Sequence, residues 1–258
     1  FPMLFVLLLF IAVAIIAQDV EESMTTAEII AHWGYPVEEI DVVTEDGYIL
    51  NMLRIPHGLT STGFSQFSEN SSCHRPPILM IHGLMGDATE FVMNPPESSP
   101  GMILADAGFD VFLLNVRGTT YSQRHVNLTK DDGEFWRFST DDLAKYDAPA
   151  AIDKVLALNG AQGLYIVGHS QGTIVSFMML ADRPEYNSKV RAMFELAPAG
   201  SIRYVRGVGR FIFTLVDNLN GLLSAYKMLL GSHEFGIHSP WLLGGVARIL
   251  CHPLMSYE

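Results

Sequence analysis

Cysteine and positive charge are both scarce in this sequence of 258 residues. Its two cysteines, Cys73 and Cys251, cannot form a disulfide framework, and the sequence does not show whether they pair with each other. Lys and Arg number 16 against 28 Asp and Glu, and no basic patch stands out, so nucleic acid is not expected as a partner. We find no metal-ligand cluster and no phosphate-binding glycine loop, and we therefore predict no metal and no cofactor.

An apolar run over residues 3–17 (MLFVLLLFIAVAIIA) lies at the start of the chain. It is too short for a comfortable transmembrane helix, and Ala14 and Ala17 offer small residues for cleavage. We predict a signal peptide at residues 1–17, although no basic segment precedes it, with a signal anchor as the alternative. Entry into the secretory pathway would make the N-x-S/T sequences at Asn70 and Asn127 glycosylation sites.

Alternating and apolar runs predict an α/β domain. Hydrophobic residues make up 49% of the chain, enough for a sizeable core. The runs at 39–44 and 48–55, joined by Glu45-Asp46-Gly47, predict a hairpin. Further apolar segments predict strands at 77–81, 110–114, 164–167 and 192–196, and helices at 25–33, 101–107 and 148–158. Asp147 is expected to cap the last of these helices, and the aromatic cluster at 135–139 is expected in the core.

The sequence GHSQG at 168–172 follows an apolar strand and precedes an apolar helix. This is the context of the G-x-S-x-G turn, in which a serine on a sharp strand-to-helix turn projects from the sheet above a helix N-terminus. The flanking glycines remove Cβ atoms that would collide with the strand and the helix. Ser170 is therefore the predicted nucleophile, and the backbone N–H of Gln171 a predicted donor to an oxyanion.

The loop after the strand at 77–81 reads His82-Gly83-Leu84. In the fold that carries this serine turn, the loop supplies the second oxyanion donor, which we assign to the backbone N–H of Leu84. His82 precedes the loop and is expected to shape it rather than to act as a base. Arg117, in the loop after the strand at 110–114, is expected to pin loops through a buried ion pair rather than to contact substrate.

Eight segments in order resemble the animal acid lipases, the family of lysosomal acid lipase and gastric lipase. They are WGYP at 33–36, VTEDGYIL at 43–50, HGL at 82–84, LADAG at 104–108, NVRG at 115–118, FW at 135–136, KYDAPA at 145–150 and VGHSQG at 167–172. The resemblance implies an α/β-hydrolase fold and hydrolysis of neutral lipid esters, triacylglycerols or steryl esters, at a lipid droplet, lipoprotein or membrane interface. It also implies a lysosomal or extracellular location.

The expected catalytic triad is incomplete. In this fold the acid and the base follow the nucleophile, after strands seven and eight, whereas we count about six of eight strands, in residues 25–200, and then the beginning of a helical cap at 201–258. The triad Asp and His are therefore expected to be absent. Asp217 with His233, His238 or His252 has the right order but lies on predicted cap segments.

Three hypotheses follow. The first is a fragment of a secreted acid lipase, inactive as written, which the abrupt start and end of the chain favour. The second is a truncated product that binds lipid without catalysis. The third is another serine hydrolase on the same fold, such as a thioesterase or peptidase, since the serine turn does not determine the leaving group.

Overall fold

The computed structural model describes residues 20–59, 75–200 and 206. By contacts the chain divides into one unit of residues 26–233 and another of residues 1–25 and 234–258. Of the second unit only residues 20–25 are described, with the 3-10 helix η1 (Val20–Ser23). The predicted signal peptide, the sites at Asn70, Cys73 and Cys251, and the predicted cap apart from Arg206 lie outside the described residues.

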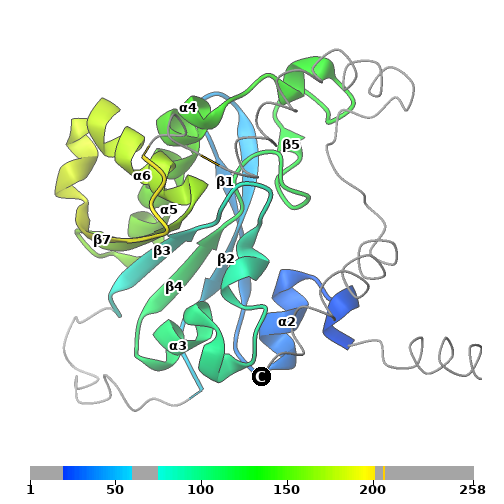
Figure 1. Cartoon of the computed structure of the whole chain (residues 1–258), viewed down its shortest axis with the longest axis vertical. Coiled ribbons are helices and arrows are strands. Elements are labelled where there is room, and N and C mark those ends of the chain that lie inside the picture. The colour runs from blue at the N-terminus through cyan, green and yellow to red at the C-terminus, as the bar shows by residue number, and fades with distance from the viewer. Residues whose placement is uncertain (1–19, 60–74, 201–205, 207–258) are drawn as a thin grey trace, which may run out of the picture. The chain divides into compact units, whose positions relative to one another are not determined.

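The strands of the unit 26–233 form one mixed sheet (Figure 1). Within the described residues the strands are β1 (Glu38–Val43), β2 (Tyr48–Ile55), β3 (Pro77–Ile81), β4 (Asp110–Leu114), β5 (Arg124–His125), β6 (Leu164–His169) and β7 (Val190–Leu196). Their order is β1-β2-β4-β3-β6-β7, with β5 paired to β2. The pairs β3–β4, β3–β6 and β6–β7 are parallel, and those of β2 with β1, β4 and β5 are antiparallel.

All six predicted strands are present, and β5 is an addition to them. β5 has only two residues, which pair with Tyr48 and Ile49 of β2. A two-residue strand is too short for any alternation of apolar and polar residues to show in the sequence. The hairpin turn between β1 and β2 is also present, with Gly47 at φ 99°, a conformation that side chains with a Cβ disfavour.

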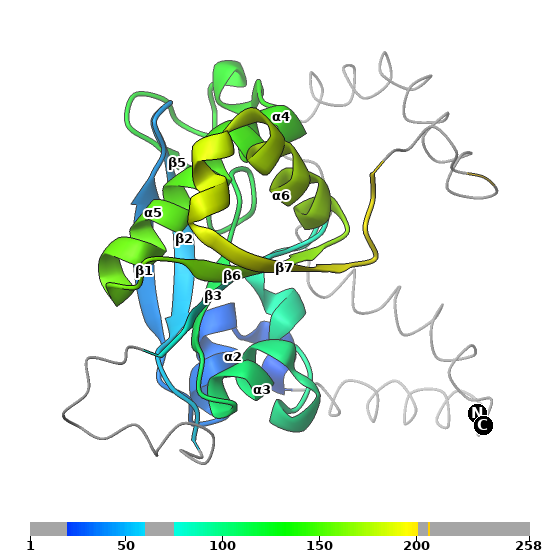
Figure 2. The same ribbon diagram turned by 90° about the vertical axis from the view of Figure 1, so that its left-hand side faces the viewer.

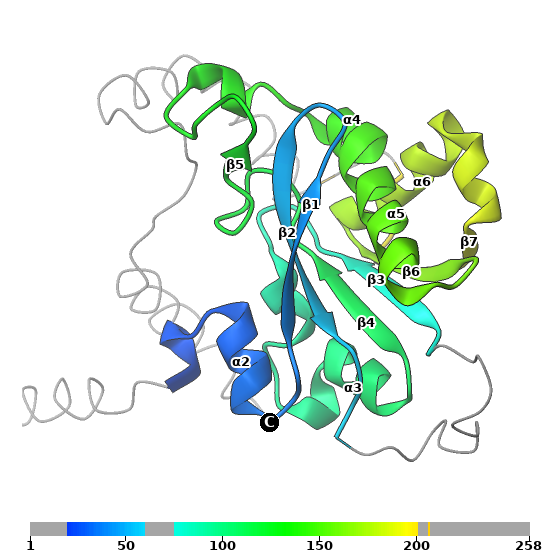
Figure 3. The ribbon, with the colours of Figure 1, turned by 180° about the vertical axis from the view of Figure 1, so that it is seen from behind.

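Helices cover both faces of the sheet. In the part of the chain that the structure describes, the α-helices are α2 (Thr26–His32), α3 (Pro100–Asp106), α4 (Thr140–Asp142), α5 (Ala148–Asn159) and α6 (Gln171–Asp182). Short 3-10 helices occupy η2 (Ala88–Phe91), η3 (Pro96–Ser98), η4 (Gly133–Trp136) and η6 (Pro184–Ser188), and η5 (Leu143–Asp147) is a π-helix. Figure 2 views the sheet edge-on, with α5 and α6 on one side and α2 and α3 on the other, and Figure 3 shows the same layers from behind.

The strands at the centre of the sheet are the most deeply buried. Every residue of β3 and of β4 is buried, as expected for parallel strands covered on both faces. The face of α5 predicted to meet the sheet does so, with Ile152 and Val155 fully buried. Phe135, from the predicted aromatic cluster, is also fully buried. Because β3 and β6 are parallel neighbours, their carboxyl ends lie side by side at one edge of the sheet.

The prediction that Asp147 caps α5 is wrong. Asp147 has helical dihedral angles at the end of the π-helix η5, and its side chain makes no capping hydrogen bond. Its carboxylate instead accepts hydrogen bonds from the backbone N–H and the Nε of Arg117, at 2.9 and 2.7 Å. A buried guanidinium is costly without a charged partner. The start of α5 needs no cap, because the helical turns of η5 precede it directly. The expected buried ion pair of Arg117 is thereby confirmed.

Candidate active site

Ser170 occupies a strained turn between β6 and α6. Its dihedral angles are φ 49° and ψ −108°, far from the regions that residues other than glycine usually adopt. Two hydrogen bonds hold this backbone: the Ser170 N–H donates to the carbonyl of Leu196 at 3.0 Å, and the Ser170 carbonyl accepts from the N–H of Thr173 at 3.1 Å. The sharp strand-to-helix turn expected from the sequence is therefore present.

The two glycines of the turn are required by packing. A Cβ on Gly172 would lie 2.2 Å from the carbonyl oxygen of Ile81, at the end of β3. A Cβ on Gly168 would lie 2.3 Å from a carboxylate oxygen of Glu195 and 3.0 Å from the backbone of Gly172. The helix therefore begins close against β3, and the serine between the glycines is carried to the sheet edge.

The loop after β3 reaches Ser170. Ile81 pairs with Gly168 in the parallel register, so β3 and β6 end at the same level. A Cβ built on Gly83 would lie 3.3 Å from the Cβ of Ser170. The structure thus brings together the serine turn and the His82-Gly83-Leu84 loop, which are far apart in the sequence.

His82 orients the peptide group that carries the Leu84 N–H. Its Nδ1 lies 2.8 Å from the carbonyl oxygen of Gly83, and its Nε2 accepts a hydrogen bond from the N–H of Val116 at 3.3 Å, so the proton belongs on Nδ1. The Gly83 carbonyl and the Leu84 N–H share one planar peptide and point in opposite directions. Fixing the carbonyl against His82 therefore turns the Leu84 N–H away from His82.

Two backbone donors at this edge have no acceptor among the residues that the structure describes. In the described part of the chain no hydrogen bond uses the Leu84 N–H. The N–H of Gln171 begins α6 and so lies among those that have no partner within a helix. That these two N–H groups bind an oxyanion stays a prediction.

His82 is buried and neutral. Burial lowers its pKa, and both ring nitrogens already have partners in the protein. This environment agrees with the expectation that His82 shapes the loop, since a base must be able to receive a proton.

Three side chains that the sequence analysis did not single out lie beside the turn. Glu90 of η2 contacts Nδ1 of His169 and accepts a hydrogen bond from the Gly83 N–H at 3.0 Å. The Thr173 hydroxyl donates to the Ser170 carbonyl at 2.6 Å and accepts from the N–H of Ala199 at 3.0 Å. Glu90 lies far from the serine in the sequence, and the G-x-S-x-G pattern ends at Gly172, so neither side chain is identified by a sequence signal.

Glu195 of β7 is the third of these side chains. Both of its carboxylate oxygens are shielded from solvent and have no hydrogen-bond partner in the described residues. Burial raises its pKa to about 7. A protonatable carboxyl group therefore packs against the backbone of the serine turn, at Gly168.

The described ranges give the Ser170 hydroxyl no acid or base partner. Within them, no hydrogen bond joins the Ser170 hydroxyl to an imidazole or a carboxylate, and Asp217, His233, His238 and His252 lie outside them. The same ranges contain no group of three or more metal-ligating residues. No helix among the described residues is long and apolar enough to cross a membrane.

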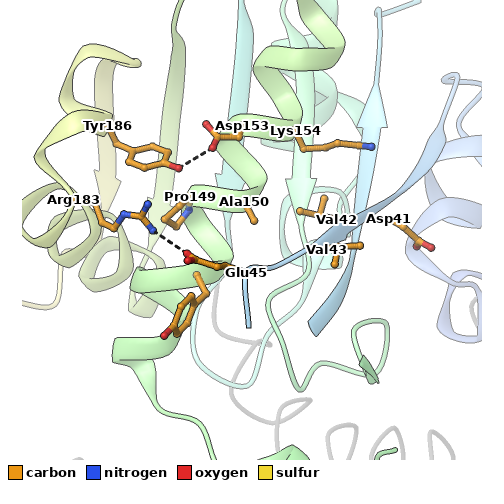
Figure 4. Close-up of a pocket in the computed structure, with 11 residues that line it drawn as sticks. Asp41, Val42, Val43, Glu45, Pro149, Ala150, Asp153, Lys154, Arg183 and Tyr186 are labelled. Atoms are coloured by element: carbon orange, nitrogen blue, oxygen red, sulfur yellow. Dashed lines mark hydrogen bonds and ion pairs between the residues drawn. The ribbon is translucent and has the colours of Figure 1, made fainter. Parts of the chain in front are cut away.

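A cavity of about 490 Å³ lies elsewhere, along β1, the first half of α5 and the end of α6 (Figure 4). Two contacts join side chains that line it: Tyr186 donates to Asp153 at 2.8 Å, and Arg183 lies 3.8 Å from Glu45. Ser170 and the loop after β3 are not among its lining residues. This cavity is therefore not the candidate active site.

Two family profiles match the chain. One, described as a partial alpha/beta-hydrolase lipase region, covers residues 26–95, and the other, described as the alpha/beta hydrolase fold, covers residues 76–215. Among solved structures, one described as an epoxide hydrolase mutant from Pseudomonas aeruginosa has a TM-score of 0.53 at 17% identity, covering 86% of this chain and 61% of that one. These matches confirm the predicted fold class.

Curated relatives are lipases. Lipase member M of Mus musculus is 43% identical over 85% of this chain and 49% of its own length. Gastric triacylglycerol lipase of Bos taurus is 41% identical over 87% of this chain and 53% of its own. Lysosomal acid lipase/cholesteryl ester hydrolase of Homo sapiens is 40% identical over 93% of this chain and 57% of its own length. The predicted resemblance to the acid lipases is confirmed, and the chain spans about half the length of these relatives.

Proposed function

Because the chain belongs to the alpha/beta-hydrolase family, we propose that its protein is a serine hydrolase of neutral lipid esters, triacylglycerols or steryl esters. The observation that carries the proposal is the position of Ser170. The serine lies on a strained turn at the sheet edge, against a loop whose Leu84 N–H has no acceptor in the described residues. The relatives named as triacylglycerol lipase and cholesteryl ester hydrolase support the substrate class.

The proposed reaction passes through an acyl-enzyme. The Ser170 Oγ attacks the ester carbonyl carbon and gives its proton to a base, and the carbonyl oxygen becomes an oxyanion that accepts hydrogen bonds from the Leu84 and Gln171 N–H groups. The C–O bond to the alcohol then breaks, and the alcohol leaves with the proton from the base. Water attacks the acyl-serine in the same way and releases the fatty acid.

The base and the carboxylate that orients it are proposed to come from outside the described residues. A serine with no base keeps its proton and is a poor nucleophile. Loss of triad members reduces kcat by about 10⁴- to 10⁶-fold, so the described residues alone are expected to hydrolyse esters very slowly. Whether the triad is supplied by a longer product can be determined by reading the transcript past the codon of Glu258.

Apolar side chains around the loop favour a lipid substrate. Leu84 and Met85 of this loop expose 63 and 77% of their surface. Exposed apolar groups next to a polar reaction centre suit an acyl chain or the surface of a lipid droplet, lipoprotein or membrane. We propose such an interface as the partner of this site.

We place the protein in the secretory pathway, in lysosomes or outside the cell. The predicted signal peptide and the lipase relatives named gastric and lysosomal support this location. Asn127 lies exposed in a bend between β5 and η4, where a glycan has room. The test expresses the protein and its Asn127→Gln variant in animal cells and treats both with a glycosidase. We expect the glycosidase to lower the mass of the natural protein by one glycan more than that of the variant.

A labelling experiment tests the function. The complete protein is incubated with a phosphonate ester that reacts with activated serines, and the modified residue is identified by mass spectrometry. We expect Ser170 to be labelled, and Ser170→Ala to lose hydrolysis of triolein and cholesteryl oleate. Ser188→Ala, which changes an exposed hydroxyl in η6, is the matched control.

A substrate panel separates the other possibilities. Preference for thioesters or peptides over esters would overturn the lipase proposal while keeping Ser170 as nucleophile. Binding to lipid vesicles without hydrolysis or labelling would favour a non-catalytic lipid-binding product.

A further inference from the structure

Glu90 connects the loop after β3 to the end of β6. Its Oε2 accepts a hydrogen bond from the Gly83 N–H at 3.0 Å, and its Oε1 contacts Nδ1 of His169. Gly83 is the residue before Leu84, and His169 is the residue before Ser170. One carboxylate group therefore bridges the two backbone segments that carry the proposed oxyanion donor and the proposed nucleophile.

The backbone of Glu90 is held firmly. It lies in η2, whose N-cap Asp87 accepts a hydrogen bond from the Thr89 N–H at 2.8 Å. The N–H of Ala88 donates to the side chain of Asn115 at 2.8 Å, and Phe91 is buried in the core. The carboxylate of Glu90 therefore extends from a well-anchored backbone toward the loop after β3.

Two glycines leave room for the carboxylate. A Cβ on Gly86 would lie 2.9 Å from Oε2 of Glu90. A Cβ on Gly83 would lie 3.6 Å from the same oxygen and 3.2 Å from Nδ1 of His169. The Glu90 side chain is 26% exposed and that of His169 38%, so the contact is partly shielded from water.

We propose that Glu90 and His169 are a positioning pair that holds the Leu84 amide at the right distance from Ser170. The inference rests on the proposed function, and it assigns neither residue to proton transfer, because in the described residues neither makes a hydrogen bond to the Ser170 hydroxyl. The hydrogen bond from the Gly83 N–H directs Oε2 of Glu90 toward the loop, and Oε1 contacts Nδ1 of His169, so the carboxylate spans the two backbone segments.

The size of the effect follows from the sensitivity of oxyanion binding to geometry. Losing one donor costs about 10²- to 10³-fold in kcat, and a displacement of about 1 Å costs about 10²-fold. Removing the bridge without removing the donor should therefore lower kcat by about 10- to 100-fold. KM should stay within about twofold, because the ester carbonyl in the ground state carries little charge.

The kinetic test compares variants of the complete protein. Glu90→Ala and His169→Leu are expected to lower kcat with KM unchanged, and the double variant should lose no more than the worse of the two. His169→Asn, which keeps a donor near the position of Nδ1, should recover part of the loss. Glu97→Ala, which changes an exposed carboxylate in η3, is the matched control. Additive losses, or equal changes in kcat and KM, would overturn the proposal.

A second measurement does not depend on activity. Hydrogen exchange of the peptide containing residues 82–86 is compared between the natural protein and Glu90→Ala, with Glu97→Ala again as control. We expect faster exchange of this loop in Glu90→Ala and an unchanged global melting temperature. Unchanged exchange would reject the bridge even in an active enzyme. A protein that shows the change in exchange but hydrolyses no ester would reject the proposed function and keep the bridge.

Discussion

Arg117 and Asp147 form an ion pair that solvent does not reach. The guanidinium lies 2.6 Å from the carboxylate, and their side chains are 1% and 0% exposed. The same guanidinium also contacts Asp46 at 2.6 Å and lies 3.9 Å from the ring centroid of Tyr48. Arg117 therefore joins the turn of the first hairpin, the loop after β4 and the start of α5.

Replacing Arg117 by Leu should destabilise the protein strongly. The change leaves the Asp147 carboxylate buried without a partner, which typically costs about 3–5 kcal/mol. Arg124→Ala, which breaks the exposed pair with Asp41, should cost less than about 1 kcal/mol. Denaturant unfolding of both variants measures the difference. Equal losses would contradict the importance of the buried pair.

Gly172→Ala should prevent the close approach of α6 to β3. The new Cβ would lie 2.2 Å from the backbone oxygen of Ile81, which cannot rotate away. Overpacking typically costs about 1–3 kcal/mol, and here a backbone clash is expected to reach or exceed the upper value. Gly200→Ala, where a Cβ meets nothing within 4 Å, is the control. Thermal unfolding compares the two, and a Gly172→Ala protein as stable as the control would show that the turn can shift.

Thr173→Val should lower activity more than stability. Val keeps the shape of the side chain but loses the hydroxyl that bonds to the Ser170 carbonyl at 2.6 Å. The hydroxyl also accepts a hydrogen bond from the Ala199 N–H, and each of the two bonds contributes about 1 kcal/mol to stability, whereas a shift of Ser170 would reduce kcat by about 10-fold or more. Ser176→Ala, which removes a hydroxyl bonded to Gly172 one turn later, should leave kcat near that of the natural protein. Equal kcat values for both variants would contradict the prediction.

Glu195 should make stability depend on pH. Its pKa rises from an ordinary value of 4.5 to about 7 in the folded protein, because the carboxyl is buried. Between these values the folded state holds a proton that the unfolded state has lost, so the contribution to stability is complete below pH 4.5 and is lost as the pH rises through 7. Glu195→Gln should remove this decline, and Glu97→Gln should not. The decline is measured as the free energy of unfolding of both variants from pH 4 to 8. Parallel pH dependences of the two variants would contradict a role for Glu195.

The local sequence pattern was sufficient to predict the main strands and the serine turn of this protein. Apolar runs predicted β3, β4 and β6 because strands buried on both faces need apolar side chains throughout. The spacing of GHSQG predicted the turn at Ser170 because only glycine fits beside that serine, as the contacts of Gly168 and Gly172 show. Each of these signals is written within a few consecutive residues.

Tertiary structure decided which side chains meet. Asp147 has the residue type and the position of a helix cap, yet it pairs with Arg117, 30 positions earlier in the chain. Glu90 meets His169, and Glu195 packs on Gly168, only because β3, β6 and β7 lie side by side in the sheet. A residue's preference is local, whereas its partner is set by the packing of distant segments, and this is why the surroundings of Ser170 could not be derived from the sequence.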